Sequence, residues 1–245
     1  MQRYFIKEEQ IKNKTVIITG GDYHHIKNVI RMNPGDRIIV CPNNGKAYLT
    51  AITAFDNKTV RVRIISELPA NPEMAVAVTV AVGYTRSTKQ EEVARRLAEL
   101  GTARFLPVFM KRSVARAGAN QERKTERLIK IVKEACEQSE RTRLMEVAAP
   151  LSFSELVAAG GDHALAIYAY EEKRNDKSLK NLINGFTGKS IIVLIGPEGG
   201  FAPEEVSFLN QAGWQAVGLG PRILRVETAP LYLMSAIAYA LELSL

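Results

Sequence analysis

The fold class of this chain is decided by the segment Ile191-Ile192-Val193-Leu194-Ile195-Gly196-Pro197-Glu198-Gly199-Gly200-Phe201. Its first five residues form an apolar, β-branched run that is typical of a strand buried on both faces. Pro203, Glu204 and Glu205 then favour the start of a helix. Because ligands bind beyond the carboxyl ends of strands in an open α/β sheet, the glycine-rich turn between strand and helix is a candidate binding loop. A tight turn that needs glycine for a positive φ explains the same residues.

A second loop of this kind follows the strand predicted at 215–219. It has the sequence Gly220-Pro221-Arg222-Ile223-Leu224-Arg225-Val226-Glu227-Thr228-Ala229-Pro230, and Thr228 can cap the apolar helix that begins at about Leu231. The carboxyl ends of parallel strands lie at one edge of a sheet, so we expect the two loops to meet there. The arginines and the glutamate of this loop either face a ligand or form a structural salt bridge, and the sequence leaves both readings open.

Strands and helices alternate from the apolar run at 74–82 to the C-terminus. Strands are predicted near 104–109, 163–169, 190–195 and 215–219. Helices are predicted at about 89–100, 121–140, 153–159, 178–184, 203–212 and 228–243. This alternation is typical of a parallel sheet covered by helices, so the predicted fold class is α/β.

The first 70 residues have a different pattern. Stretches rich in β-branched residues occur at 37–40, 46–52 and 59–65, with turn sequences between them and one short helix near 23–32. In the last of these stretches valine alternates with Arg61 and Arg63, which places the arginines on the face opposite the apolar side chains. These features indicate a small, mostly antiparallel β-barrel with a basic face.

A linker separates the two patterns, because Leu68-Pro69-Ala70-Asn71-Pro72-Glu73 has two prolines in four residues. The predicted domains are therefore 1–70 and 73–245. Basic residues are concentrated toward the N-terminus: the first 70 residues carry 11 Lys and Arg against 6 Asp and Glu, whereas 161–245 carry 7 against 9. Such an excess attracts a polyanion such as RNA, although a merely solvated surface accounts for it as well.

The composition is that of an ordinary globular protein, with 46% hydrophobic and 24% charged residues. No apolar run in the sequence is long enough for a membrane-spanning helix, and no signal peptide is evident, so we expect a soluble, cytoplasmic protein. Cys41 and Cys136 are too few for a disulfide framework or a zinc site. The adjacent His24 and His25 do not share a helix face, so we expect no bound metal.

Several common enzyme classes are disfavoured. Gly188-Lys189-Ser190 looks like the end of a phosphate-binding loop, but Ile183 stands where the first glycine is needed, and the segment precedes a strand. The glycines around Glu198 do not have the spacing of a dinucleotide-binding fingerprint. No serine, histidine and aspartate arrangement indicates a hydrolase. Nucleotide hydrolysis, nicotinamide chemistry and hydrolysis by a triad therefore lose support.

Five stretches of the chain fit the motifs of one known family. The segment 219–229 fits the signature Leu-Gly-x-Arg-Ile-Leu-Arg-x-Glu-Thr-Ala, and 195–201 fits the same family's second loop. Two middle segments also fit, at 112–114 and 137–141. The segment 24–36 is similar to the N-terminal motif His-His-x-x-x-Val-Leu-Arg-x-x-x-Gly-Asp. Together the five stretches resemble the RsmE family, which are 16S ribosomal RNA uridine-N3 methyltransferases of the SPOUT (trefoil-knot) superfamily.

The resemblance implies a PUA-like RNA-binding barrel at 1–70 and a SPOUT-type knotted methyltransferase domain at 73–245, with S-adenosylmethionine as the cofactor. In such proteins three loops wrap the cofactor, and here they are 169–171, 196–201 and 219–229. The implied cofactor-binding residues are Tyr170, Leu194, Ile195, Gly196, Pro197, Glu198, Gly199, Gly200, Leu219, Gly220, Ile223, Leu224, Arg225, Glu227, Thr228 and Ala229. The resemblance also implies a homodimer with its active site at the dimer interface.

The implied reaction adds a methyl group to N3 of a uridine in 16S rRNA of the small ribosomal subunit. That nitrogen lies between two carbonyls and carries a proton at neutral pH, so it must lose the proton before it attacks. A nearby guanidinium stabilises the resulting anion, and a carboxylate orients the arginine or accepts the proton. The candidate cations are Arg225 and then Arg222, and the candidate carboxylates are Glu198 and Glu227.

RNA contacts are expected from basic residues of both predicted domains. The candidates are Arg3, Arg31, Arg61, Arg63, Arg112, Arg116, Arg141 and Arg143. The last helix is predicted either to make the dimer contact or to belong to the ordinary core. Its apolar residues are Leu231, Leu233, Met234, Ile237, Ala238 and Leu241.

Two other functions remain open at the level of sequence. A related SPOUT enzyme would methylate a ribose or a guanine instead. A non-catalytic ribosome-assembly factor would keep the fold and bind RNA without S-adenosylmethionine. The chain also departs from the family at Arg95-Arg96, where Gln-Lys is usual, and arginine differs from lysine in shape. The family's substrate contacts on that helix are therefore not carried over.

Overall fold

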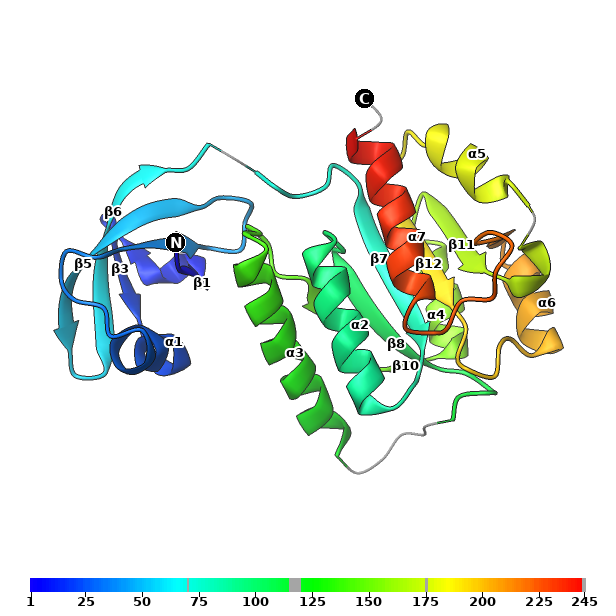
Figure 1. Ribbon diagram of the computed structural model, residues 1–245, viewed down its shortest axis with the longest axis horizontal. Helices are drawn as coiled ribbons and strands as arrows, with labels where there is room; N and C mark the ends of the chain where they lie inside the picture. Colours follow the sequence, from blue (N-terminus) through cyan, green and yellow to red (C-terminus); the bar gives the residue numbers. More distant parts are fainter. Residues whose placement is uncertain (70, 115–119, 175, 244–245) are drawn as a thin grey trace. The chain divides into compact units, whose positions relative to one another are not determined.

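The computed structural model describes residues 1–69, 71–114, 120–174 and 176–243 (Figure 1). The chain divides into two compact units: unit 1 is Met1–Glu73 with Cys136–Leu144, and unit 2 is Met74–Ala135 with Met145–Leu245. The segment Cys136–Leu144 thus joins the first unit, although the sequence placed it in the second domain. None of the helices in the described ranges combines the length and the apolar character that crossing a membrane requires.

Unit 1 is built on a six-stranded sheet with the order β1-β4-β5-β6-β3-β2. The strands are β1 (Arg3–Phe5), β2 (Ile11–Lys12), β3 (Thr15–Ile18), β4 (Arg37–Cys41), β5 (Tyr48–Asp56) and β6 (Thr59–Glu67). The helical turns are η1 (Glu8–Gln10), α1 (Gly20–His24) and η2 (His25–Val29). Strand β1 pairs with β4 in parallel, and the other pairs are antiparallel. The expected mostly antiparallel sheet is confirmed.

The core of unit 1 follows the alternation in β6. Val60 and Val62 are fully buried, whereas Arg61 and Arg63 point outward. An alternating strand must place successive side chains on opposite faces, so the basic face predicted from the sequence is present. Four of the arginines that were expected to contact RNA are exposed on unit 1. They are Arg31, Arg61, Arg63 and Arg143.

Two other arginines of unit 1 are buried, which corrects the prediction that they contact RNA. Arg141 Nη2 lies 2.7 Å from Glu73 Oε2, and these side chains are only 4% and 9% exposed. Arg3 Nη1 donates to the carbonyl oxygen of Arg141 at 3.2 Å. Burial alone would raise the pKa of Glu73, but the hydrogen bond and charge of Arg141 hold it below its usual value. Both arginines therefore tie the segment Cys136–Leu144 to the rest of unit 1.

Unit 2 contains a parallel sheet with the order β10-β8-β7-β12-β11-β13, and β9 pairs with β8. Its strands are β7 (Ala77–Gly83), β8 (Arg104–Phe109), β9 (Glu146–Val147), β10 (Leu151–Ser152), β11 (Leu165–Ala169), β12 (Ser190–Ile195) and β13 (Gln215–Val217). The remaining helices in the described ranges are α2 (Ser87–Glu99), α3 (Gln121–Gln138), α4 (Phe153–Gly160), η3 (Glu171–Lys173), α5 (Ser178–Asn184), α6 (Pro203–Gln211), α7 (Ala229–Ala238) and η4 (Tyr239–Leu243). Every pairing in this sheet is parallel, which confirms the α/β class.

Strand β12 lies between β7 and β11, and its residues from Ile191 to Ile195 are all buried. This central place explains the uninterrupted apolar run, because helices cover both faces of a parallel sheet. Helices α2 and α7 pack against each other in unit 2 (Figure 1). At the end of β7, a side chain on Gly83 would collide with the backbone of Pro197. Glycine at this position therefore lets the loop after β12 cross the end of β7.

Candidate active site

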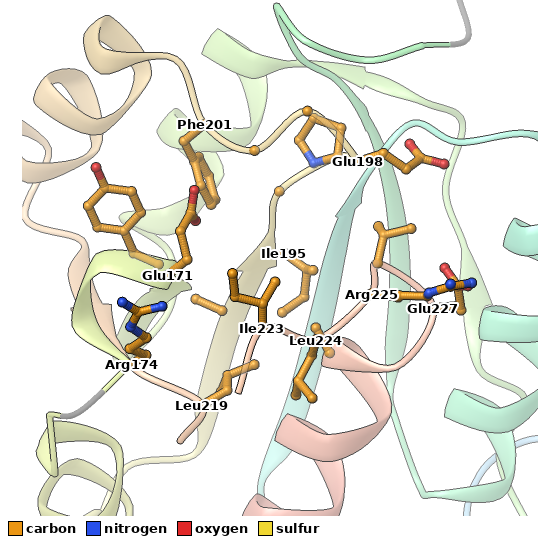
Figure 2. Close-up of a pocket in the computed structure, with 18 of the residues that line it drawn as sticks. Glu171, Arg174, Ile195, Glu198, Phe201, Leu219, Ile223, Leu224, Arg225 and Glu227 are labelled. Atoms are coloured by element: carbon orange, nitrogen blue, oxygen red, sulfur yellow. The ribbon is translucent and has the colours of Figure 1, made fainter. Parts of the chain in front are cut away.

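A cavity of about 540 Å³ lies at the carboxyl edge of the parallel sheet in unit 2. Its walls come from the three segments that follow β11, β12 and β13, namely residues 169–174, 195–201 and 219–229 (Figure 2). Lys89 of α2 contributes a further wall. This volume is in the range of small-molecule sites, and the position is where parallel α/β sheets bind ligands.

The middle of the cavity is apolar. Figure 2 shows four apolar side chains grouped there, those of Ile195, Leu219, Ile223 and Leu224. The side chain of Ile223 is 76% exposed, so a large apolar surface faces the space where a ligand would lie. Burying such a surface under a flat apolar group is favourable by about 25 cal/mol for each Å² removed from water.

The segment after β12 is held in place from outside the cavity. Phe201 packs edge-on against Tyr168, with ring centroids 5.5 Å apart. Arg112 Nη1 donates to the carbonyl oxygens of Gly199 at 3.2 Å and of Phe201 at 3.0 Å. Gly200 has a φ of +69°, which glycine adopts without strain. Arg112 was predicted to contact RNA, whereas its guanidinium here fixes the shape of a cavity wall.

One end of the cavity carries a cluster of four charged side chains. Lys89 Nζ lies 3.4 Å from Glu198 Oε1 and 3.2 Å from Glu227 Oε2. Arg225 Nη1 lies 4.0 Å from Glu227 Oε1, and its side chain is 85% exposed. A hydrogen bond from the backbone N–H of Glu227 lowers the pKa of its carboxyl group. Burial raises this pKa, but the nearby Lys89 lowers it, so that the pKa of Glu227 is below its usual value. This carboxyl group is therefore ionised at neutral pH.

The opposite end is also polar. Figure 2 places Glu171 and Arg174 there, across the apolar middle from Glu198 and Glu227. Glu171 packs closely over the loop after β12, since a Cβ atom on Gly200 would lie 3.0 Å from Glu171 Oε1. The cavity thus offers charged groups at two ends and apolar groups between them.

Most of the residues predicted to bind the cofactor line this cavity, and so do the predicted catalytic residues Arg222, Arg225, Glu198 and Glu227. Leu194 does not, because its side chain is fully buried within β12. Thr228 does not line it either: it occupies the N-cap position of α7 but makes no side-chain cap hydrogen bond. Leu194 and Thr228 thus lie outside the cavity lining, and their part in cofactor binding stays a prediction.

Two of the residues that line the cavity, Lys89 and Arg174, lie outside the loops that the sequence singled out. Lys89 lies more than a hundred residues upstream of the loops that it contacts. Its position in the first turns of the helix after β7 was the available signal, because β7 is a neighbour of β12 and its carboxyl end lies at the same edge of the sheet.

Other predicted elements lie elsewhere. Arg116 falls outside the described residues. In the described part of the chain, no three His, Cys, Asp or Glu side chains gather in a way that could hold a metal ion. In α7, Leu233, Met234 and Ile237 are fully buried within the chain and belong to its core, whereas Tyr232 is exposed.

Comparison with known families gives the class of protein first. The sequence profile of a family described as an RNA methyltransferase domain matches residues 72–238. A second profile, described as an RNA methyltransferase PUA domain, matches residues 18–65. The first match spans most of the chain, so the parallel sheet and its cavity are those of an RNA methyltransferase domain, and the basic sheet of unit 1 belongs to a PUA-like domain.

Individual relatives then give the family. Ribosomal RNA small subunit methyltransferase E of Bacillus subtilis is 38% identical, over 99% of this chain and 98% of its own length. The protein of the same name from Synechocystis is 32% identical, over 98% of this chain and 78% of its own length. A crystal structure of this enzyme from Neisseria gonorrhoeae, bound to S-adenosyl methionine, has a TM-score of 0.85 and 26% identity, over 98% of this chain and 97% of that one. The chain belongs to the ribosomal RNA small subunit methyltransferase E family, which confirms the resemblance of its sequence.

Proposed function

We propose that this protein transfers the methyl group of S-adenosylmethionine to N3 of a specific uridine in 16S rRNA of the small ribosomal subunit. The observation that carries the proposal is the cavity in unit 2 of this member of the family. The cavity has an apolar middle and two charged ends, and three loops line it. The relatives named above are small-subunit RNA methyltransferases, and one of them binds S-adenosyl methionine.

The cavity fits the chemical groups of S-adenosylmethionine. Ile195, Leu219, Ile223 and Leu224 offer an apolar slot suited to the flat adenine ring. The charged residues at the two ends suit the ribose hydroxyls and the ammonium and carboxylate of the methionine part. Gly220 has a φ of +92°, so this backbone can turn beside a ligand without strain. When bound, S-adenosylmethionine supplies an electrophilic methyl group on a sulfonium.

The charged cluster suits the removal of a proton from uridine N3. Arg225 has a largely exposed guanidinium at the cavity, where it can stabilise negative charge on the uracil carbonyl oxygens. Arg222 also lines the cavity and is the second candidate for this role. Glu227 is held ionised and can orient Arg225 or accept the proton, and Glu198 is the alternative acceptor. Holding the two reactants together supplies a further large part of the rate.

The proposal is tested with small ribosomal subunits that lack the modification. They are incubated with the protein and S-adenosylmethionine, and the RNA is digested for nucleoside mass spectrometry. We expect 3-methyluridine from the wild type and from Arg127→Ala, which changes an exposed arginine of α3 that does not line the cavity. Arg225→Ala should form it about a hundredfold more slowly. Methylated ribose or guanine would instead indicate a related enzyme, and no binding of S-adenosylmethionine would favour an assembly factor.

We further propose that the protein acts as a homodimer in the cytoplasm, where small ribosomal subunits are assembled. Since Leu233, Met234 and Ile237 are buried within the chain, the exposed face of the last helix with Tyr232 and Tyr239 is the candidate contact. Light scattering should give twice the mass of the chain, and Tyr232→Arg with Tyr239→Arg should give a monomer. A wild-type monomer would contradict the dimer.

A further inference from the structure

Lys89 connects two loops of the cavity that are distant in sequence. It lies in the first turns of α2, and its ammonium group makes ion pairs with Glu198 of the segment after β12 and Glu227 of the segment after β13. The side chains of Lys89, Glu198 and Glu227 are 37%, 29% and 23% exposed, so the three charges are only partly screened by water.

The two carboxylates would repel each other without a cation between them. Both line the same end of one cavity, and like charges that share a site disfavour each other's ionised form. Lys89 replaces this repulsion by two attractions. The arrangement therefore favours a conformation in which the two loops approach each other.

Helix α2 is a rigid support for this lysine. Gln90, Val93 and Leu97 of the helix are buried, and the helix packs against α7. A charged group on a packed helix holds its partners more accurately than one on a loop. The ammonium group is thus fixed relative to the sheet, and the two loops are fixed relative to the ammonium group.

We propose that Lys89 is a positioning residue: it clamps the Glu198 loop (196–201) to the Glu227 loop (219–229) and so preforms the binding site for S-adenosylmethionine. The identity of the ligand rests on the proposed function. In this role Lys89 acts through its ion pairs with the two carboxylates.

The test begins with the variant Lys89→Met, which keeps the length of the side chain and removes its charge. Isothermal titration calorimetry with S-adenosylmethionine should give a Kd about tenfold higher than that of the wild type, which corresponds to about 1.4 kcal/mol for two part-exposed ion pairs. Lys89→Arg should restore most of the affinity, because a guanidinium also bridges two carboxylates.

A double variant shows whether Lys89→Met weakens binding through repulsion between the two carboxylates or only through the loss of the lysine's own charge. In Lys89→Met with Glu198→Gln the repulsion between the carboxylates is gone, so the affinity for S-adenosylmethionine should be higher than in Lys89→Met alone. Lys130→Met, an exposed lysine of α3, is the matched control and should bind like the wild type. Unchanged affinity in Lys89→Met would overturn the proposal, and a lower methylation rate with unchanged affinity would assign Lys89 to the reaction itself.

Amide hydrogen exchange makes the test independent of the ligand. In the ligand-free protein, Lys89→Met should speed exchange in both loops, 196–201 and 219–229, and Lys130→Met should not. Equal exchange in the wild type and Lys89→Met would overturn the clamp. If the wild type bound no S-adenosylmethionine at all, the proposed function would fail, whereas the exchange rates would still decide the role of Lys89.

Discussion

The chain contains two clusters of charged side chains that use the same residue types for different purposes. In unit 1, Glu73 and Arg141 are buried, and Glu73 Oε1 also accepts hydrogen bonds from the backbone N–H groups of Thr142 and Arg143. In unit 2, the cluster around Glu227 is open to the cavity, and Arg225 is largely exposed. Burial and saturated hydrogen bonding thus distinguish a structural ion pair from a binding site, whereas charge alone does not.

The largest expected effect comes from breaking the buried cluster. Arg141→Met leaves the carboxylate of Glu73 buried without its main cation, so the free energy of unfolding should fall by about 3 kcal/mol or more. Chemical denaturation followed by circular dichroism measures this loss. Arg225→Met should change the same quantity by less than about 0.5 kcal/mol. Similar losses in the two variants would break the distinction between the clusters.

The pH dependence of stability sharpens the same comparison. The folded-state pKa of Glu73 is lowered, so the pair stabilises the folded protein above the ordinary glutamate pKa of about 4.3. That contribution is lost as the pH falls through the lower, folded-state pKa. The difference in unfolding free energy between wild type and Arg141→Met should therefore shrink below about pH 4. A difference that is constant down to about pH 2 would show that the charge of Glu73 is not responsible.

A smaller effect is expected at Arg112, which supports the cavity from behind. Arg112→Met removes two hydrogen bonds to the loop 196–201, so the Kd for S-adenosylmethionine should rise about fivefold, or about 1 kcal/mol. Calorimetry measures this change, and Arg127→Met serves as the control. If Arg112→Met weakened RNA binding and left the affinity for S-adenosylmethionine unchanged, Arg112 would be an RNA contact, as the sequence predicted. It would then not be a support of the loop 196–201.

The smallest effect on stability is expected at the basic face of unit 1. Arg63→Ala should leave the unfolding free energy within about 0.5 kcal/mol of the wild type, because this side chain is exposed. Binding to 16S rRNA fragments should weaken, and the dependence of log K on log salt should become less steep by about one if Arg63 contacts one phosphate. An unchanged salt dependence would remove Arg63 from the RNA-binding surface.

Much of the fold could be predicted from the sequence because the local signals agree with the final structure. The apolar run at 191–195 became the central strand β12, and Pro203 is in the first turn of α6, as predicted. The short strands β1, β2 and β3 were not located individually, because runs of two to four residues carry too little periodicity. Two of the cavity loops, 196–201 and 219–229, were found because glycines and charges follow strands of one parallel sheet, whereas the loop 169–171 was implied by the family resemblance.

The roles of individual charged residues could not be predicted from the sequence, because they depend on contacts between residues that are distant along the chain. Arg141 looks like an RNA contact until its partner Glu73, 68 residues away, is seen beside it. Lys89 looks like an ordinary surface lysine of a helix until the loops bring Glu198 and Glu227 to it. Sequence patterns report which face a residue occupies, but they do not report which partner lies opposite.

The most direct test of the function is the rate at which 3-methyluridine forms in unmodified small ribosomal subunits. With saturating S-adenosylmethionine, the wild type should form it, and Arg225→Ala should be slower by about a hundredfold while its unfolding free energy is unchanged. A wild-type protein that binds S-adenosylmethionine but leaves this RNA without 3-methyluridine would contradict the assigned reaction. An Arg225→Ala variant as fast as the wild type would contradict the assigned site.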